Sequence, residues 1–295
     1  MEQHHTGHEH THHGERGARL VFWLTVVTMV VEILAGWAFG SMAVLVDGWH
    51  MASHAGALGV AWFAYGFARR HAANADFVFG TGKVNALAGF ASAVGLGIVA
   101  AYMAVESVTR LFHPVDIAFG QATLVAVLGL GVNLVSAWLL RDADHSHAHD
   151  HNLKAAYLHV LADALTSVLA IAALLGGRYL GVAWLDPLAG MAGAVVISRW
   201  SWGLVRDTAA VLLDRMPGPA LAERARGLLE NGRQAKVRHL AIWQVGPRRH
   251  AAAVTLEDAE PQPPENYKAL LAGIDGLTHI TVEVHHRPCP AEGRP

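Results

Sequence analysis

The first two thirds of this 295-residue chain are dominated by apolar stretches that are long enough to cross a membrane as helices. A helix needs about 20 mostly apolar residues to span the hydrocarbon core of a bilayer. The composition fits this class, since 53% of the residues are hydrophobic and only 16% are charged. We therefore expect a membrane α-helical bundle of six transmembrane helices, followed by a small soluble domain. The predicted spans are Leu20–Phe39, Met42–Ala68, Val84–Val108, Phe119–Leu140, Leu153–Leu175 and Trp184–Val205.

The distribution of lysine and arginine predicts which ends of the spans face the cytoplasm. Only Arg110 and Arg178 lie on one face, whereas the other face carries Arg16, Arg19, Arg69, Arg70, Lys83, Arg141, Lys154, Arg206 and Arg215. We expect a multi-pass protein of a bacterial-type inner membrane with both termini in the cytoplasm. The polar N-terminus lacks the plan of a signal peptide. With a net charge of −2, nothing indicates a nucleic-acid partner.

Changes in composition divide the chain into three predicted parts. Residues 1–17 form a histidine-rich cytoplasmic tail that we expect to be disordered, residues 18–213 the transmembrane domain, and residues 214–295 a cytoplasmic domain. The pattern in the last part predicts a small α+β domain of αββαβ order with a ferredoxin-like fold. Its expected elements are a helix Pro217–Gly232, strands Lys236–Gln244 and Ala251–Glu257, a helix Asn266–Gly273 and a strand His279–His286.

Ionisable residues recur at helical spacing inside two of the predicted spans. The second span carries His50 and His54, and the fifth carries His159 and Asp163, so each pair is four residues apart on one helix face. Ionisable groups inside a membrane usually mark an ion or proton pathway. Three imidazoles and one carboxylate suit a tetrahedral transition metal and not magnesium or calcium. Asp47 is open to three interpretations: a fifth ligand, an acceptor behind the ligands, or a helix-packing residue.

The same ligands suggest how the metal is released. Imidazole has an unperturbed pKa of about 6.5 and binds metal only when neutral, so protons and metal compete for the same nitrogens. The sequence therefore predicts metal efflux by proton antiport, with the metal as cargo and no resident cofactor. Glu32, Glu106 and Asn133 are also polar within spans. Because no partner for them can be identified from the sequence, helix packing is favoured over a role in the pathway.

Two histidine tracts lie outside the spans, on the predicted cytoplasmic face. The loop 142–152 carries His145, His147, His149 and His151, and we expect these residues to bind metal weakly. The N-terminal tract contains His4, His5, His8, His10, His12 and His13. Cys289 is the only cysteine, which excludes a disulfide framework and a cysteine-based metal cluster.

Taken together, the six spans, the paired ligands and the αββαβ tail resemble the cation diffusion facilitator family over residues 18–290. The runs GSMAVLVDGWHMASHA, FGTGKVNALAG and HDHNLKAAYLHVLADALTS are similar to its cobalt/nickel-efflux branch. The resemblance implies metal export and a homodimer formed through the tail. Family members usually carry His-x-x-x-Asp or Asp-x-x-x-Asp in the second span, whereas this chain carries His50 and His54. An added imidazole suits cobalt, nickel or zinc better than manganese; the resemblance favours cobalt and nickel.

The family also binds regulatory metal in its tail, and this chain matches that pattern in part. His239, His250 and His285 are the candidate tail ligands, with His279 and His286 nearby, while Val254 and Arg287 occupy positions where the family has ligands. The loop between the second and third spans lacks the family's histidine, so we expect no metal there.

Two other classes of function deserve comparison with transport. An intramembrane metalloprotease would need a His-Glu-x-x-His motif, which this sequence lacks. A membrane metal sensor or storage protein would account for the histidine tracts but not for a second ligand set within the spans. A zinc-selective antiporter of the same fold is the other alternative. A primary pump is disfavoured because the sequence contains no phosphate-binding glycine loop.

Overall fold

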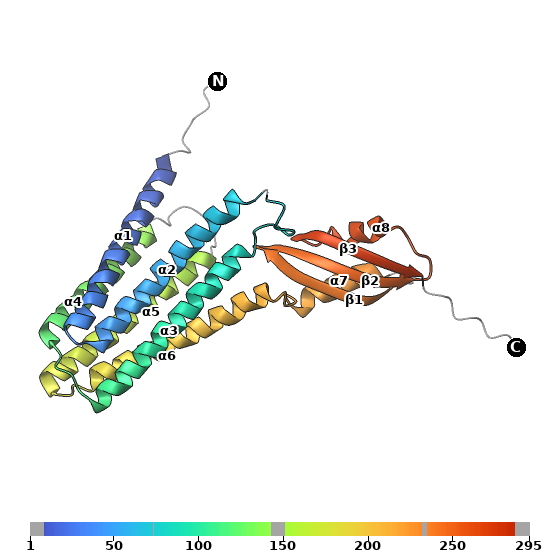
Figure 1. The fold of residues 1–295 in the computed structure, drawn as a ribbon. Helices are drawn as coiled ribbons and strands as arrows, with labels where there is room; N and C mark the ends of the chain where they lie inside the picture. The colour runs from blue at the N-terminus through green and yellow to red at the C-terminus, as the bar shows by residue number, and fades with distance from the viewer. Residues whose placement is uncertain (1–8, 73, 143–150, 232–234, 287–295) are drawn as a thin grey trace, which may run out of the picture. The chain divides into compact units, whose positions relative to one another are not determined.

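The computed structural model describes residues 9–72, 74–142, 151–231 and 235–286. Six long helices come first, as the apolar stretches predict, and a small sheet with two short helices follows (Figure 1). The long helices are α1 Glu9–Ala38, α2 Met42–Arg70, α3 Val84–Phe112, α4 Phe119–Asp142, α5 His151–Leu180 and α6 Leu185–Leu212. Within the described residues, α3, α6 and the segment Phe119–Ser136 of α4 are long and apolar enough to cross a membrane. Shorter apolar segments, Phe22–Ala38 and Ala164–Leu180, lie in α1 and α5.

The first helix begins earlier than the sequence analysis predicted. Residues 1–17 were expected to form a disordered tail, but α1 already starts at Glu9, while residues 1–8 lie outside the described part. No proline interrupts Glu9–Gly17. A helix that is nucleated in the apolar segment can therefore extend backwards at the low cost of propagation.

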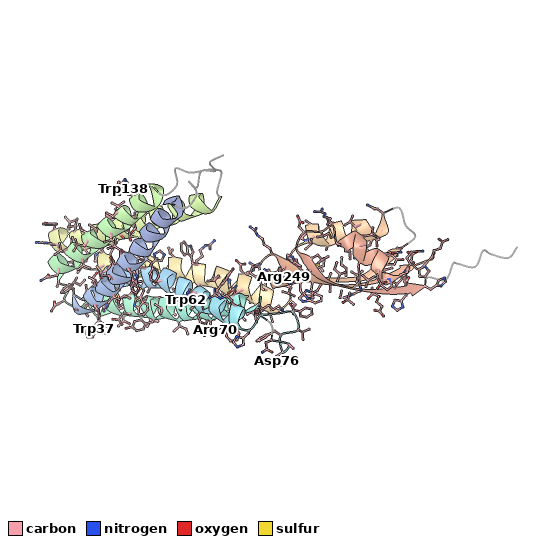
Figure 2. The ribbon with its side chains drawn as sticks, turned by 90° about the horizontal axis from the view of Figure 1, so that it is seen from above. Trp37, Trp62, Arg70, Asp76, Trp138 and Arg249 are labelled. Atoms are coloured by element: carbon pink, nitrogen blue, oxygen red, sulfur yellow. The ribbon has the colours of Figure 1, made fainter. Side chains whose placement is uncertain are left out.

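Small residues and outward-facing aromatic residues shape the helical part. Helix α4 packs against both α1 and α5, and at Gly129 of α4 an added Cβ would collide with the carboxyl group of Glu32 from α1. The indoles of Trp37, Trp62 and Trp138 are largely exposed and project outward from their helices (Figure 2). Close helix contacts at glycine combined with apolar side chains on the outside are typical of helices packed in lipid.

The sheet part has the predicted αββαβ order. Its elements are α7 Pro219–Glu230, β1 Lys236–Gly246, β2 Arg249–Asp258, α8 Pro264–Leu271 and β3 Leu277–His286. Both helices bury apolar residues against one face of the sheet, including Leu229 of α7 and Tyr267 and Leu271 of α8.

The strand arrangement differs from the ferredoxin-like fold that we expected. The sheet order is β1-β2-β3, with β2 antiparallel to β1 and parallel to β3. A ferredoxin-like sheet splits its parallel βαβ pair with another strand, whereas here β2 and β3 are direct neighbours connected through α8. The alternating pattern of the sequence predicts strands but not their order across the sheet.

By compactness the chain divides into two units, which we describe separately. The first contains the described residues up to Gly59 and Ser92–Gly203, and the second contains Val60–Ala91 and the chain from Leu204 onward. In the second unit, the loop before α3 packs on the sheet: the ring of Phe79 stands edge-on to Trp243 at 5.8 Å and to His279 at 5.6 Å. Lys83 donates to the Asp214 carboxylate at 2.5 Å. The predicted tail thus shares a compact unit with this loop.

Candidate metal site

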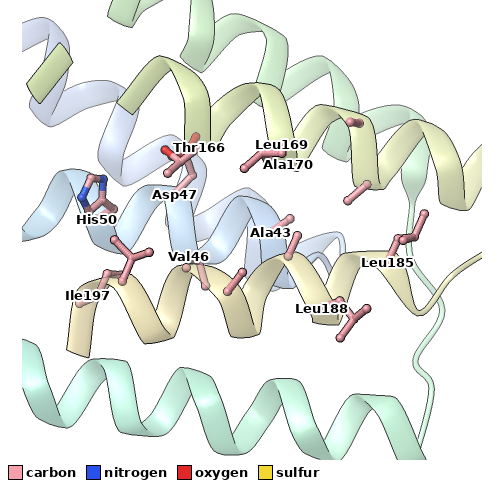
Figure 3. Close-up of a pocket in the computed structure, with 16 residues that line it drawn as sticks. Ala43, Val46, Asp47, His50, Thr166, Leu169, Ala170, Leu185, Leu188 and Ile197 are labelled. Carbon is pink, nitrogen blue, oxygen red and sulfur yellow. The ribbon is translucent and has the colours of Figure 1, made fainter. Parts of the chain in front are cut away.

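Helix α2 carries two polar residues of the predicted site into the interior of the first unit. Asp47 and His50 are three residues apart on one helix face and are only 4% and 5% exposed. Figure 3 shows both side chains between α5 and α6. Buried ionisable groups in an apolar helix are costly unless other groups or an ion compensate them. That α2 supplies ligands to an ion site stays a prediction.

Asp47 connects α2 to α5 through hydroxyl groups. The hydroxyl of Ser167 donates to Oδ2 of Asp47 at 2.7 Å, and that of Thr166 lies 3.4 Å from Oδ1. Ser167 is fully buried. The sequence left the role of Asp47 open, and in this structure its carboxylate accepts hydrogen bonds from α5. It therefore fixes the approach of the two helices that carry the predicted ligand pairs.

The positions of the other predicted ligands along α2 and α5 can be given relative to this contact. His159 and Asp163 lie on α5, with position 163 one turn before Ser167 and position 159 two turns before it. His54 lies one turn after His50 on α2. The side chains of these three residues lie outside the described part of the structure. The described residues contain no group of three or more histidine, cysteine or acidic side chains close enough to share a metal, so the four-ligand set stays a prediction.

His50 borders an apolar cavity of about 440 Å³ that is lined by α2, α5 and α6. The cavity extends from Leu185 and Leu188, at the start of α6, to Asp47 and His50 (Figure 3). On the α6 side the ring of Trp200 lies 5.5 Å from the imidazole, between ring centroids. Among the residues lining this space, only Asp47, His50 and Thr166 are polar. An ion at Asp47 and His50 would thus meet polar groups at one end of a largely apolar passage.

Glu32 has surroundings that the sequence could not predict. Its side chain is fully buried, and in the described part of the chain neither carboxyl oxygen has a hydrogen-bond partner. It packs between Gly129 of α4 and Gly48 of α2. Glu106, by contrast, has a partner one turn away, because the guanidinium of Arg110 donates to its carboxylate at 2.8 Å. Glu32 thus lies where α1, α2 and α4 meet, whereas Glu106 pairs within its own helix α3.

The candidate tail histidines lie at different places on the sheet. His239 on β1 and His285 on β3 are exposed, whereas His250 on β2 is half-buried. His285 pairs with Glu257, seven residues along β2 from His250. At about 3.3 Å per residue that separates the two by about 23 Å, so they cannot share one ion. His285 instead contacts Glu283 at 3.1 Å.

The histidine tracts fall mostly outside the described residues. His145, His147 and His149 lie in the undescribed segment 143–150, and His4, His5 and His8 in the segment 1–8. His151 is the first residue of α5, and its side chain is not described. The weak metal binding expected of both tracts stays a prediction.

Two structural residues escaped the sequence analysis altogether. Ser167 was not considered as the partner of Asp47, and Asp186 at the start of α6 was not considered at all, although it is fully buried. A carboxylate in the first turn of a predicted span is interpreted as a boundary residue, since its partners lie more than 140 positions away. Only a serine followed by an apolar run, at Ser41, offered a local signal of a helix start.

Comparisons with known proteins extend over nearly the whole chain. A model described as the cation efflux transmembrane domain matches residues 18–213. The chain is 32% identical to "Zinc transporter ZitB" of Pectobacterium atrosepticum, over 96% of this chain and 89% of that relative. It is also 32% identical to "Metal cation efflux system protein CzcD" of Cupriavidus metallidurans, over 96% and 91%. Identity to "Cadmium, cobalt and zinc/H(+)-K(+) antiporter" of Bacillus velezensis is 26%, over 94% and 91%.

Proposed function

The chain belongs to the cation diffusion facilitator family of cation efflux proteins, and we propose that it exports a divalent transition metal in exchange for protons. As a member of this family it is a membrane transporter of divalent metal cations and not an enzyme. Family membership alone leaves open the direction of transport, the counter-ion and the metal site. The metal is held between α2 and α5 by His50, His54, His159 and Asp163, with Asp47 beside them.

The observation that carries the proposal is the buried contact between Asp47 and Ser167. It brings together the two helices on which the predicted ligands lie, at the level of His50 and one turn from position 163. A site built by two helices can change its geometry when one of them moves, as alternating access requires. Asp47 accepts hydrogen bonds from the hydroxyl groups of Ser167 and Thr166 on α5. We infer that it orients the site and does not itself coordinate the metal.

The donor chemistry limits the choice of metal. Imidazole suits zinc, cobalt and nickel, whereas an all-oxygen shell would suit magnesium, calcium or manganese. One relative carries zinc in its name, and another carries cadmium, cobalt and zinc. Zinc is therefore at least as well supported as cobalt. Nickel rests on the resemblance of the sequence motifs to the cobalt/nickel branch.

Proton coupling follows from the same imidazoles. A histidine with the ordinary pKa of about 6.5 is largely neutral in the cytoplasm and becomes protonated on a more acidic side of the membrane. Protonation there would displace the metal, and the return of the empty site would carry protons inward. The Bacillus velezensis relative has a proton in the name of its exchange reaction.

The apolar cavity is the exit path in this proposal. With the N-terminus in the cytoplasm, the start of α2 and the start of α6 lie at the outer face, and the cavity runs from there to His50. Its walls offer few ligands, so an ion released from the imidazoles would not be held again on the way out. We further propose an inner-membrane location and a homodimer.

Uptake of radioactive zinc and cobalt into inside-out membrane vesicles tests the proposal. We expect uptake that depends on an outward-directed proton gradient, with the vesicle lumen acidic. Asp163→Ala should abolish this uptake, whereas Asp76→Ala, in the exposed loop after α2, is the matched control and should retain it. Metal bound to the membranes without gradient-dependent uptake would favour a sensor or storage protein instead.

A further inference from the structure

A buried carboxylate at the start of α6 holds the start of α2. Asp186 is fully buried, and its carboxylate accepts three hydrogen bonds. The hydroxyl of Ser41 donates to Oδ1 at 2.6 Å, the backbone N–H of Met42 to Oδ2 at 2.7 Å, and that of Ala43 to Oδ1 at 3.2 Å. All three donors belong to the residue before α2 or to its first turn.

These contacts satisfy groups that a helix cannot satisfy by itself. The first N–H groups of a helix have no partner within it, and a negative charge is favourable beside them. Ser41 supplies a second cap, because its hydroxyl oxygen accepts from the N–H of Val44 at 3.2 Å. Hydrogen bonds to an ionised carboxylate are roughly twice as strong as neutral ones. The contact is thus a strong connection between two helices that are far apart in sequence.

After Asp186 along α6, two glycines let α2 approach closely. A Cβ added at Gly190 would lie 2.8 Å from the Cβ of Met42, and one added at Gly193 would collide with Cγ1 of Val46. Two turns further along, Trp200 of α6 lies beside His50. The two helices therefore run in parallel with a defined register. The cavity lies between this pair and α5.

From these contacts we propose that Asp186 is a positioning residue, which fixes the height and rotation of α2 on α6 and thereby places Asp47 and His50. This inference rests on the proposed function. His50 lies nine residues after Ser41, about 13 Å along the helix at 1.5 Å per residue. Asp186 is too distant to coordinate an ion at His50, and it acts through the helix.

A covalent replacement of the contact tests this role. In a Cys289→Ser background, Asp186→Ala should raise the KM for zinc and the Kd of the purified protein for zinc at least about tenfold, with a smaller change in the maximal rate. The double variant Ser41→Cys with Asp186→Cys should behave like Asp186→Ala when it is reduced. When it is oxidised, and the disulfide is verified by mass, KM should return to within about threefold of wild type. Asp207→Asn, an exposed position on the same helix, is the matched control and should change nothing.

Two results would overturn the inference. An oxidised double variant that is as defective as the reduced one would mean that the carboxylate itself takes part in transport. An unchanged KM and Kd in Asp186→Ala would mean that α2 keeps its position without it. Hydrogen exchange at the amides of Met42 and Ala43 measures these hydrogen bonds independently of transport. We expect the exchange to be faster in Asp186→Ala. If the wild-type protein moves no metal, the proposed function fails, whereas the exchange result still decides whether Asp186 holds α2.

Discussion

Ser167 on α5 donates a hydrogen bond of 2.7 Å to Oδ2 of Asp47 on α2, and both side chains are buried. The two residues are 120 positions apart in the sequence. Because His50 follows Asp47 by less than one turn, this bond determines where α5 meets the candidate site. The bond therefore connects the packing of α2 and α5 to the positions of the predicted metal ligands on these helices.

Replacing Ser167 by alanine should weaken both the fold and the site. The change removes a hydrogen bond to a buried carboxylate, which typically costs about 1–3 kcal/mol of stability. We expect a lower melting temperature in detergent and a severalfold weaker affinity for zinc by titration calorimetry. Ser201→Ala is the matched control, since it removes a buried hydrogen bond to the backbone oxygen of Ala93. Equal losses of zinc affinity in the two variants would show that the Ser167–Asp47 bond has no specific effect on the metal site.

Two glycines on α4 provide a test of the packing around Glu32. Gly129→Ala would push a methyl group into the Glu32 carboxyl, whereas a Cβ at Gly131 meets nothing within 4 Å. Overpacking typically costs about 1–3 kcal/mol, while alanine in place of glycine in an open helical position gains up to about 1 kcal/mol. Thermal unfolding should therefore show a lower melting temperature for the first variant only. Similar melting temperatures would mean that Glu32 is not confined by α4.

The sequence predicts the parts of this molecule that depend on local pattern. Apolar length located the six helices, and alternation located the strands, because both signals are contained in a few consecutive residues. The start of α1 at Glu9 was missed because helix propagation beyond an apolar segment leaves no hydrophobic signal. The strand order, the Ser167–Asp47 bond and the Asp186 contact were beyond prediction, since each joins segments that only the folded chain brings together.

Changing His54 to aspartate should alter the preference among metals. A carboxylate makes the predicted site harder and more negative, so the ratio of manganese to zinc transport should rise at least about threefold. Competition between the two metals in vesicle uptake measures this ratio directly. His71→Asp, outside the predicted site, serves as the control. The same metal profile in wild type and His54→Asp would place selectivity elsewhere.

Removing residues 1–14 should affect metal capture without affecting the transport step. The tract offers six histidines that can hold metal near the membrane. We expect the KM for zinc to rise about two- to fivefold and the maximal rate to stay the same. Complete loss of transport in a protein that still inserts into the membrane would show that the tract is part of the pathway.

Metal-driven proton flux in proteoliposomes is the most direct test of proton-coupled metal transport through His50, His54, His159 and Asp163. Zinc, cobalt, nickel and manganese are added to purified protein, with a pH-sensitive dye on the opposite side of the membrane. Proton movement with zinc and cobalt, absent with manganese and in His159→Ala, is the predicted result. Metal transport without proton movement would contradict the antiport, and normal flux in His159→Ala would contradict the site.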